Sequence, residues 1–224
     1  MSGMIELKAQ PDGGLTRDFP MMRRRRMMGL AGGLTVATLA AARGSVPLVR
    51  SGIVRGDIRR GFGTATGVAR GVPLDIRLRV TSANSGRPLA GSAVYLWHCD
   101  REGNYSLYST GLEGENYLRG VQAADSAGWA RFGSIFPGTH DGHWPHLHVE
   151  VYPHLGADDP LYSGQIELPG DACEKAYATG GYEAARLDPA TMTMPFEMAC
   201  VTGDVRRGMV ATFEIMATPT PVRG

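Results

Sequence analysis

The amino-acid sequence predicts an all-β fold, a β-sandwich with few or no helices. Three observations indicate this fold class. Several short segments alternate apolar and polar residues with the period of two that is typical of half-buried strands. Turn clusters separate these segments, in a chain that holds 31 Gly and 14 Pro. After residue 43 the sequence has no amphipathic helix of ordinary length, apart from one helical turn near 172–177.

The strands can be assigned in chain order. The clearest alternation is Leu74–Val80, where charged residues separate four apolar ones, and a turn cluster over 82–88 follows it. Residues 111–127 are expected to form a long connection, and long ordered loops tend to carry function. Strands are expected over residues 74–80, 93–99, 129–136, 146–152 and 209–215.

Charge divides the 224-residue chain into two parts. The net charge is +1, but residues 1–42 carry six positive and three negative side chains, a net of +3. The remaining 17 positive and 19 negative residues give segment 43–224 a net of −2. This balance excludes a broadly basic nucleic-acid binder and an acidic disordered tail. We expect an N-terminal extension over 1–42 and one β-sandwich domain over 43–224.

The extension has the features of an export signal. Arg23–Arg26 precede sixteen weakly apolar residues, 27–42, that end in small side chains. Adjacent arginines before such a stretch resemble a twin-arginine signal, and the stretch is too short and too rich in Gly and Ala for a stable membrane span. The protein is therefore expected to be exported, or cytoplasmic if the segment is not a signal. In an oxidising compartment Cys173 and Cys200 would be available to pair, leaving Cys99 as a buried thiol.

Four of the six histidines fall within nine residues, at His140, His143, His146 and His148. On a strand over 146–152, residues two apart share a face, so His146 and His148 point the same way. Two imidazoles on one polar face are typical of a metal site. Imidazole suits Zn, Cu, Fe and Ni, so the pair does not select the metal. Tyr105 follows a strand and a glycine turn, and by itself is as well explained by packing.

Several long motifs, in the same order along the chain, resemble those of the intradiol ring-cleavage dioxygenases. The similarity to the exported, single-domain branch of that family covers roughly residues 49–216. The motifs include Trp97–Asp100, Gly103–Ser106, Asn116–Gln122 and Trp144–Tyr152. The resemblance implies a Greek-key β-sandwich and a mononuclear non-haem Fe(III) held by two tyrosinates and two histidines. It also implies an oxidoreductase that acts on a catechol-like aromatic substrate and O2. Tyr105, His146 and His148 match three of the family's ligands.

The sequence departs from the family pattern at two positions. Where the family has Pro-Gly-x-Tyr-x-Gly-Arg, this chain has His140 in place of the tyrosine and His143 in place of the arginine. The resemblance implies that the tyrosine leaves the metal when substrate binds, and that the arginine stabilises the substrate. We therefore expect His140 and His143 to be catalytic, and Tyr105, His140, His146 and His148 to be the metal ligands.

The tyrosine-to-histidine replacement has a consequence for the metal. An imidazole in place of a tyrosinate raises the net charge of the site by one, which disfavours the ferric state. Fe(III) remains the expected metal because of the resemblance, with Cu(II) as the alternative because it binds imidazole tightly. An imidazole also remains a suitable proton acceptor near neutral pH.

Three further residues are candidates for substrate binding. Arg119 and Gln122 lie in the expected long connection, where a structural hydrogen-bond network would explain them equally well. Gln165 matches a family glutamine near the substrate. Tyr108 and Tyr117 could shape a slot for an aromatic ring, although packing is the more common role of tyrosine.

Three functions agree with these observations. The first is an intradiol-type dioxygenase acting on a catechol. The second is a divergent metalloenzyme of the same fold, with copper or another metal, that oxidatively modifies a phenolic or other secondary metabolite. The third is a non-catalytic sandwich that binds a ligand or a surface. The sequence does not indicate an oligomeric state.

Overall fold

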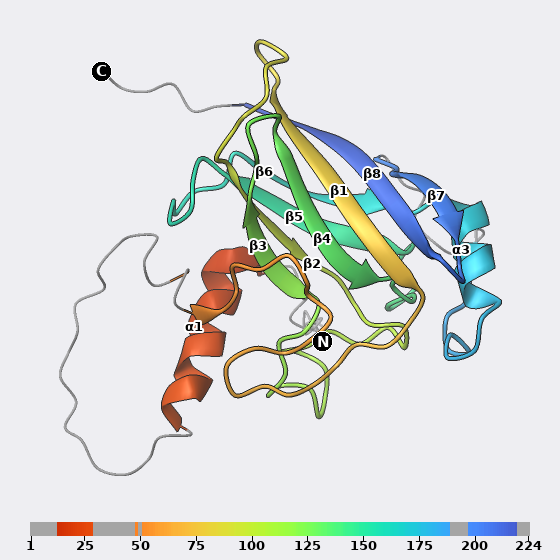
Figure 1. The fold of residues 1–224 in the computed structure, drawn as a ribbon. Coiled ribbons are helices and arrows are strands. Elements are labelled where there is room, and N and C mark those ends of the chain that lie inside the picture. Colours follow the sequence, from red (N-terminus) through yellow and green to blue (C-terminus); the bar gives the residue numbers. More distant parts are fainter. Residues whose placement is uncertain (1–12, 29–47, 49–50, 189–196, 219–224) are drawn as a thin grey trace, which may run out of the picture.

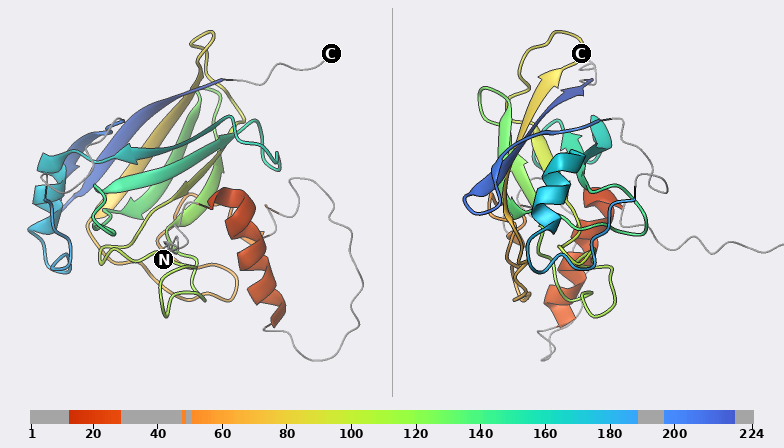
Figure 2. Two further views of the ribbon diagram at one scale, coloured as in Figure 1. Left: turned by 180° about the vertical axis from the view of Figure 1, so that it is seen from behind. Right: turned by 90° about the vertical axis from the view of Figure 1, so that its right-hand side faces the viewer.

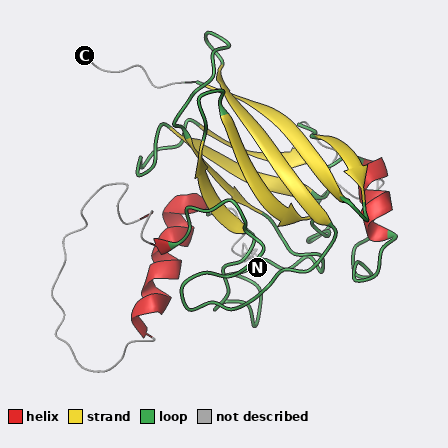
Figure 3. Ribbon diagram, viewed as in Figure 1, coloured by secondary structure: helices red, strands yellow, loops and turns green. Residues whose placement is uncertain are grey.

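The computed structural model describes residues 13–28, 48, 51–188 and 197–218 (Figure 1). Among them, eight strands and the helices α1 and α3 are assigned (Figure 3). The helices are α1 (Gly14–Met28) and α3 (Gly170–Tyr177). The strands are β1 (Pro73–Ser82), β2 (Ala93–Trp97), β3 (Arg119–Ala123), β4 (Trp129–Ile135), β5 (His146–Tyr152), β6 (Tyr162–Glu167), β7 (Cys200–Asp204) and β8 (Gly208–Ala217).

The strands form two stacked four-stranded sheets (Figure 2). The first sheet has the order β4-β1-β8-β7, in which β1 and β8 are parallel and the other pairs are antiparallel. The second sheet has the order β3-β2-β5-β6 and is antiparallel throughout. The predicted β-sandwich is confirmed, and α3 lies at one end of it beside β7 (Figure 1).

The core between the sheets follows from the alternation seen in the sequence. Leu74, Ile76, Leu78 and Val80 of β1 are all buried and face the second sheet. The three charged residues that alternate with them point outward. From the second sheet, β5 contributes its alternate residues from Leu147 to Val151 to the same core. Each buried Leu, Ile or Val of this kind stabilises the fold by about 1.5–3 kcal/mol.

The outer face of the second sheet is covered as well. All seven residues of β5 are buried, so the histidine face of this strand also packs against other parts of the chain. A second apolar cluster lies there, in which Leu15 and Met22 of α1 pack with Tyr95 and Trp97 of β2. The views in Figures 1 and 2 show α1 beside this sheet. The expected N-terminal extension therefore contributes a helix to the cover of this face.

Three strands were not expected from the sequence. These are β3, β6 and β7, and the expectation of an unbroken connection over 111–127 is wrong at Arg119–Ala123. In β3 an arginine and a glycine take the place of alternating apolar residues. The arginine is buried in an ion pair, so its burial leaves no apolar residue in the sequence. Such a strand carries no hydrophobic period to detect.

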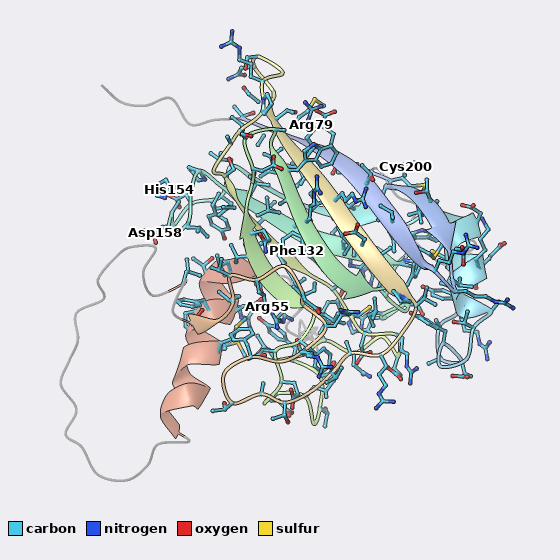
Figure 4. All side chains as sticks on the ribbon, viewed as in Figure 1. Arg55, Arg79, Phe132, His154, Asp158 and Cys200 are labelled. Carbon is cyan, nitrogen blue, oxygen red and sulfur yellow. The ribbon has the colours of Figure 1, made fainter. Side chains whose placement is uncertain are left out.

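The three cysteines are free thiols, so Cys173 and Cys200, which would be available to pair in an oxidising compartment, are not bonded here. Cys173 points from α3 into the core, whereas Cys200 is exposed at the start of β7 (Figure 4). Cys99 is buried, as expected. In the part of the chain that the structure describes, no helix has the length and apolar character needed to cross a membrane.

His98 connects the two sheets. It follows β2 directly and is 1% exposed. Its Nδ1 donates to the carbonyl of Cys99 at 2.7 Å, and its Nε2 lies 2.6 Å from the hydroxyl of Ser134 in β4 of the opposite sheet. Burial lowers the pKa of His98 from 6.5 to about 4, so the ring is neutral in the folded protein at neutral pH. Both ring nitrogens thus have partners within the fold.

We predict that His98 makes the fold sensitive to acid. Its pKa is lower in the folded protein than in the unfolded chain, so its stabilisation is complete above pH 6.5 and is lost as pH falls toward about 4. The loss reaches about 3 kcal/mol at most. Urea unfolding of the wild type and of His98→Gln across this pH range should show a steeper decline for the wild type. Parallel curves for the two proteins would contradict the assignment.

Candidate metal centre

The two strand histidines meet a tyrosine on the covered face of the second sheet. His146 and His148 are 7% and 3% exposed, and their Nε2 atoms lie 2.9 Å apart. The hydroxyl of Tyr105, which is also buried, lies 3.1 Å from Nε2 of His148. The structure thus brings together three of the four ligands that the sequence predicts.

The orientation of both imidazoles is set by neighbouring groups. The carbonyl of Trp144 can only accept, so Nδ1 of His146 donates to it at 2.6 Å and leaves Nε2 of neutral His146 as an acceptor. The indole of Trp144 is itself anchored to the carbonyl of Leu168 at 2.7 Å. His148 stacks on Trp97, its cross-strand neighbour, with ring centroids 4.8 Å apart and planes within 8°. Metal-binding histidines commonly donate their second ring nitrogen to a carbonyl, as His146 does to Trp144.

Tyr105 is positioned by a turn that depends on a glycine. Gly103 has φ +87°, and a Cβ at this position would lie 2.1 Å from the carbonyl oxygen of Thr139. Only glycine therefore allows the loop to approach the segment that leads into His140. Beyond it, the backbone N–H of Tyr105 donates to the hydroxyl of Ser109 at 2.9 Å, which fixes the start of the next turn.

His140 and His143 flank a tight turn at the rim of the site. Asp141 and Gly142 have φ values of 45° and 75°, and the N–H of His143 donates to the carbonyl of His140 at 2.8 Å. Positive φ at both central residues is the pattern of a type I′ turn, for which Asp-Gly is a preferred sequence. The Asp-Gly pair in the motif thus explains why the two histidines lie side by side.

The rings of these two histidines are placed by contacts with the surrounding loop and with neighbouring rings. His140 packs its ring against Tyr105 with centroids 4.9 Å apart, while its Nδ1 lies 2.7 Å from the carbonyl of Gly103. Its Nε2 is 3.5 Å from the carboxylate of Asp141. The ring of His143 lies 6.2 Å from that of His146. The roles of His140 as a fourth ligand and of His143 as a catalytic group remain predictions.

The donors present fit a metal ion. Two ligands that are each about 2.1 Å from one metal are about 3 Å apart when they are neighbours around it, which matches the 2.9 and 3.1 Å separations. Burial, and then the nearby His146 and Arg119, hold the pKa of His148 well below its ordinary value, so it presents the neutral imidazole that metals bind. Within the described ranges, no group of three or more His, Cys, Asp or Glu side chains is arranged to hold a metal. The hydroxyl of Tyr105 is the oxygen atom beside the two imidazoles.

The predicted substrate-binding residues occupy different positions. Gln165 of β6 pairs with His148 across the strands and is exposed, so it lies on the same face as the metal ligands. Gln122 pairs with Val94, whose side chain is in the core between the sheets, so the structure does not bring it to the metal centre. Arg119 pairs with Trp97 on the ligand face and is fully buried.

The partner of Arg119 was not expected from the sequence. It is Asp18 of α1, and the side chains of Arg119 and Asp18 are 1% and 0% exposed. The carboxylate of Asp18 also accepts from the hydroxyl of Tyr95 at 2.6 Å and from the hydroxyl of Tyr108. Burial, and then Asp18, raise the pKa of Tyr95 well above its ordinary value, so its hydroxyl stays protonated. No local pattern in the sequence marks an aspartate in an arginine-rich segment as a buried residue.

A second contact fixes the beginning of α1. Glu150 of β5 accepts from the backbone N–H of Leu15 at 2.8 Å and from the hydroxyl of Tyr152 at 2.6 Å. An acidic side chain at a helix N-terminus satisfies a donor that has no partner within the helix. The alternation in β5 predicts that Glu150 shares the histidine face, but not that a helix covers it.

Comparison with known proteins agrees with the geometry. A family model described as Dioxygenase matches residues 59–150, a segment that includes Tyr105 and all four clustered histidines. A chlorocatechol 1,2-dioxygenase of Rhodococcus opacus is 36% identical over 64 residues, which are 27% of this chain and 25% of that protein. The match thus spans only about a quarter of the relative's length.

The fold is also similar to that of a solved structure, an intradiol ring-cleavage dioxygenase from Tetranychus urticae. The TM-score is 0.64 at 20% identity, over 75% of this chain and 87% of the other. The two-sheet sandwich is therefore the fold of intradiol dioxygenases, and residues 59–150 match the Dioxygenase family in sequence.

We predict that removing Asp18 alone destabilises the protein strongly. Breaking a buried ion pair leaves an uncompensated charge and costs about 3–5 kcal/mol, whereas replacing both partners by apolar residues costs far less. Urea unfolding should therefore rank Asp18→Leu well below both the wild type and the double variant Asp18→Leu/Arg119→Met. The exposed ion pair of Asp171 with Lys175 provides the control, because Asp171→Ala should leave the midpoint unchanged. Equal losses for the single and double variants would contradict a buried charge pair.

Proposed function

We propose that the protein is an intradiol-type dioxygenase, a metal-dependent oxidoreductase that acts on a catechol-like aromatic substrate. In the overall reaction one catechol and one O2 give one muconate-type diacid, with both oxygen atoms retained in the product. The observation that carries this proposal is the convergence of Tyr105, His146 and His148, with donor atoms 2.9 and 3.1 Å apart. These are residue types that bind a redox-active metal, and they lie within the segment that matches the family model.

The proposed metal is Fe(III), held by Tyr105, His146 and His148 with His140 as the fourth ligand. Such an ion would supply the Lewis acidity and redox capacity that ring opening by O2 requires. The protein's own part is to orient the donors, to exclude water and to manage protons. Trp97 and Trp144 hold the imidazoles, and burial of this face keeps bulk water away.

His140 and His143 are the groups available for proton transfer. Both lie at the rim of the site and are only half-buried, so they reach both the ligand face and solvent. A catechol must lose its hydroxyl protons to bind as a dianion, and an imidazole is suited to accept one near neutral pH. We propose that His140 takes this proton, the role that the family resemblance gives to a tyrosine. Gln165, exposed on the ligand face opposite His148, is proposed to contact the ring substituents.

A second function is supported by the histidine at position 140. A site of three imidazoles and one phenol suits Cu(II), which binds such ligands more tightly than other divalent ions of the series. In this case the protein would modify a phenolic metabolite oxidatively without cleaving its ring. A third function, a binding module without catalysis, predicts that the histidines can be removed without affecting ligand binding.

Export from the cytoplasm is also proposed. Its support is the run Arg23–Arg26 and the weakly apolar stretch that follows. Residues 29–42, which hold most of that stretch, lie outside the described residues.

We predict that the metal depends on the three convergent residues. His146→Ala and His148→Ala should each lower the metal content of the purified protein severalfold and abolish O2 uptake with catechol, because each removes one donor. Tyr105→Phe should remove the purple-red absorption that a tyrosinate gives with Fe(III). Elemental analysis, absorption spectra and an oxygen electrode provide the measurements.

The matched control is His154→Ala. His154 is exposed in the loop after β5 and lies apart from the site (Figure 4), so this change should leave metal content and O2 uptake unchanged. Wild-type levels of metal in His148→Ala would contradict the proposed centre. Iron-loaded wild type that is colourless and consumes no O2 with any catechol would contradict the dioxygenase reaction, and copper as the native metal would favour the second function.

We predict that His140 sets the choice of metal. His140→Tyr restores an anionic ligand, which should favour Fe(III) over Cu(II) and strengthen the purple-red band. The experiment is to express both proteins in medium that contains the two metals in equal amounts and to compare metal content and spectra. His154→Tyr introduces the same residue at an exposed position and should change neither. An unchanged iron-to-copper ratio in His140→Tyr would mean that residue 140 does not reach the metal.

A further inference from the structure

We infer that Asp100 is a positioning residue of the metal centre, which sets how the loop of Tyr105 lies against the segment that carries His140. Asp100 is buried and lies three residues after the end of β2. It acts through these two residues and not as a ligand. Its effect on a metal rests on the proposed function, whereas the arrangement itself rests on the hydrogen bonds of Asp100.

Asp100 closes the tight turn that precedes Tyr105. Its N–H donates to the carbonyl of Asn104 at 2.8 Å, and its carbonyl accepts from the N–H of Gly103 at 3.1 Å. Its Oδ1 accepts from the N–H of Glu102 at 3.0 Å and from that of Asn104 at 2.8 Å. A carboxylate that accepts from the backbone two residues on forms an Asx turn. Because Tyr105 follows directly, this turn fixes the direction in which the chain reaches it.

Two further bonds join the turn to other parts of the chain. The carbonyl of Asp100 also accepts from the N–H of Gly138 at 2.9 Å, two residues before His140. Its Oδ2 accepts from the hydroxyl of Tyr117 at 3.1 Å. Gly138 leaves no room for a side chain, because a Cβ there would lie 2.4 Å from the carbonyl oxygen of Arg101. The turn and the segment that leads into His140 are therefore in direct backbone contact.

This contact reaches the rings of both residues. The carbonyl of Gly103 lies 2.7 Å from Nδ1 of His140, and the rings of His140 and Tyr105 pack edge to face with centroids 4.9 Å apart. The hydroxyl of Tyr105 is in turn 3.1 Å from Nε2 of His148. A small displacement of the turn would therefore move the phenol relative to both imidazoles. Metal sites tolerate little such displacement, because the donors must be held within about 0.5 Å of the productive geometry.

The chain uses the same turn a second time, in the connection from β3 to β4. There Oδ1 of Asp125 accepts from the N–H groups of Ala127 and Trp129, both at 2.9 Å. The carbonyl of Asp125 accepts from Gly128, and its N–H donates to Trp129, in the pattern seen at Asp100. Asp125 is exposed, whereas Asp100 is buried. The pair thus separates the general effect of losing such a turn from an effect on the metal centre.

The test uses the full-length, metal-free protein and titrates it with Co(II) in competition with a chelator. Asp100→Ala should bind Co(II) about 10–100-fold more weakly than the wild type, the usual effect of removing a group that orients a ligand. Asp100→Asn keeps Oδ1, and the hydroxyl of Tyr117 can accept from the new amide, so its affinity should stay within about threefold. Asp125→Ala should leave the affinity unchanged. Glu102 and Asn104 are exposed, so water can bond their N–H groups in Asp100→Ala.

A second readout needs no metal. In the metal-free protein the ring of Tyr105 shifts the NMR signals of the His140 imidazole, and the size of this shift depends on the distance and angle between the rings. Asp100→Ala should change the shift, whereas Asp100→Asn and Asp125→Ala should preserve it. The His140 signals are assigned as those that disappear in His140→Ala.

The following outcomes would overturn the proposal. They are an unchanged His140 shift in Asp100→Ala, and equal losses of Co(II) affinity in Asp100→Ala and Asp125→Ala. An effect of Asp100→Asn as large as that of Asp100→Ala would also overturn it, because the bonds to Oδ1 survive in that variant. If Asp100→Ala does not fold, Asp100→Ser is used, since a serine hydroxyl forms the same turn more weakly. Asp100→Ser must then weaken Co(II) binding severalfold and move the His140 signals, or the proposal is wrong.

The two readouts separate this proposal from the proposed function. If even the wild type binds no metal but the His140 shift responds to Asp100→Ala as expected, the proposed function fails. The role of Asp100 in placing Tyr105 against His140 then stands. If the wild type binds the metal and consumes O2 with a catechol while the His140 shift ignores Asp100→Ala, the proposed function stands and the role of Asp100 fails.

Discussion

The burial of β5 on both faces is the constraint on which the site depends. A pleated strand sends alternate residues to opposite faces, so one face can enter the core while the other presents His146 and His148. Imidazoles on an open sheet surface would remain hydrated and mobile. Covering this face lowers the pKa of His148, so its ring is neutral, and it brings Tyr105 within 3.1 Å of that ring. The cover is therefore part of the site.

A buried ion pair is one of the contacts that hold this cover. Arg119 is fully buried on a sheet face, a position that a charged residue occupies only with a partner. Asp18 is that partner, and it comes from a segment whose sequence favours neither burial nor a stable helix. The pair thus joins the N-terminal segment to the row of residues that ends at His148. An arginine that could be a substrate ligand by sequence is here satisfied from within the chain.

The sequence predicts those features that repeat locally. The alternation in β1 and β5 predicts the sandwich and the shared face of the two histidines, and the similarity of the Gly103–Ser106 motif to the family adds Tyr105. The sequence does not predict β3, because Arg119 interrupts its pattern, nor the role of Asp18, because its partners are about 80 to 100 residues away. The register between strands and the position of α1 depend on tertiary contacts, and these contacts decide which side chains meet.

The two departures from the family pattern offset each other in charge. Relative to the family pattern, an imidazole at 140 in place of a tyrosinate removes one negative charge, and an imidazole at 143 in place of an arginine removes one positive charge. The total is unchanged, but positive charge is removed from the substrate rim. Arg119 supplies a cation on the same face, and its field contributes to the low pKa of His148. Asp18 neutralises that cation in a buried ion pair. Through Asp18 the helix is part of the electrostatics of this face.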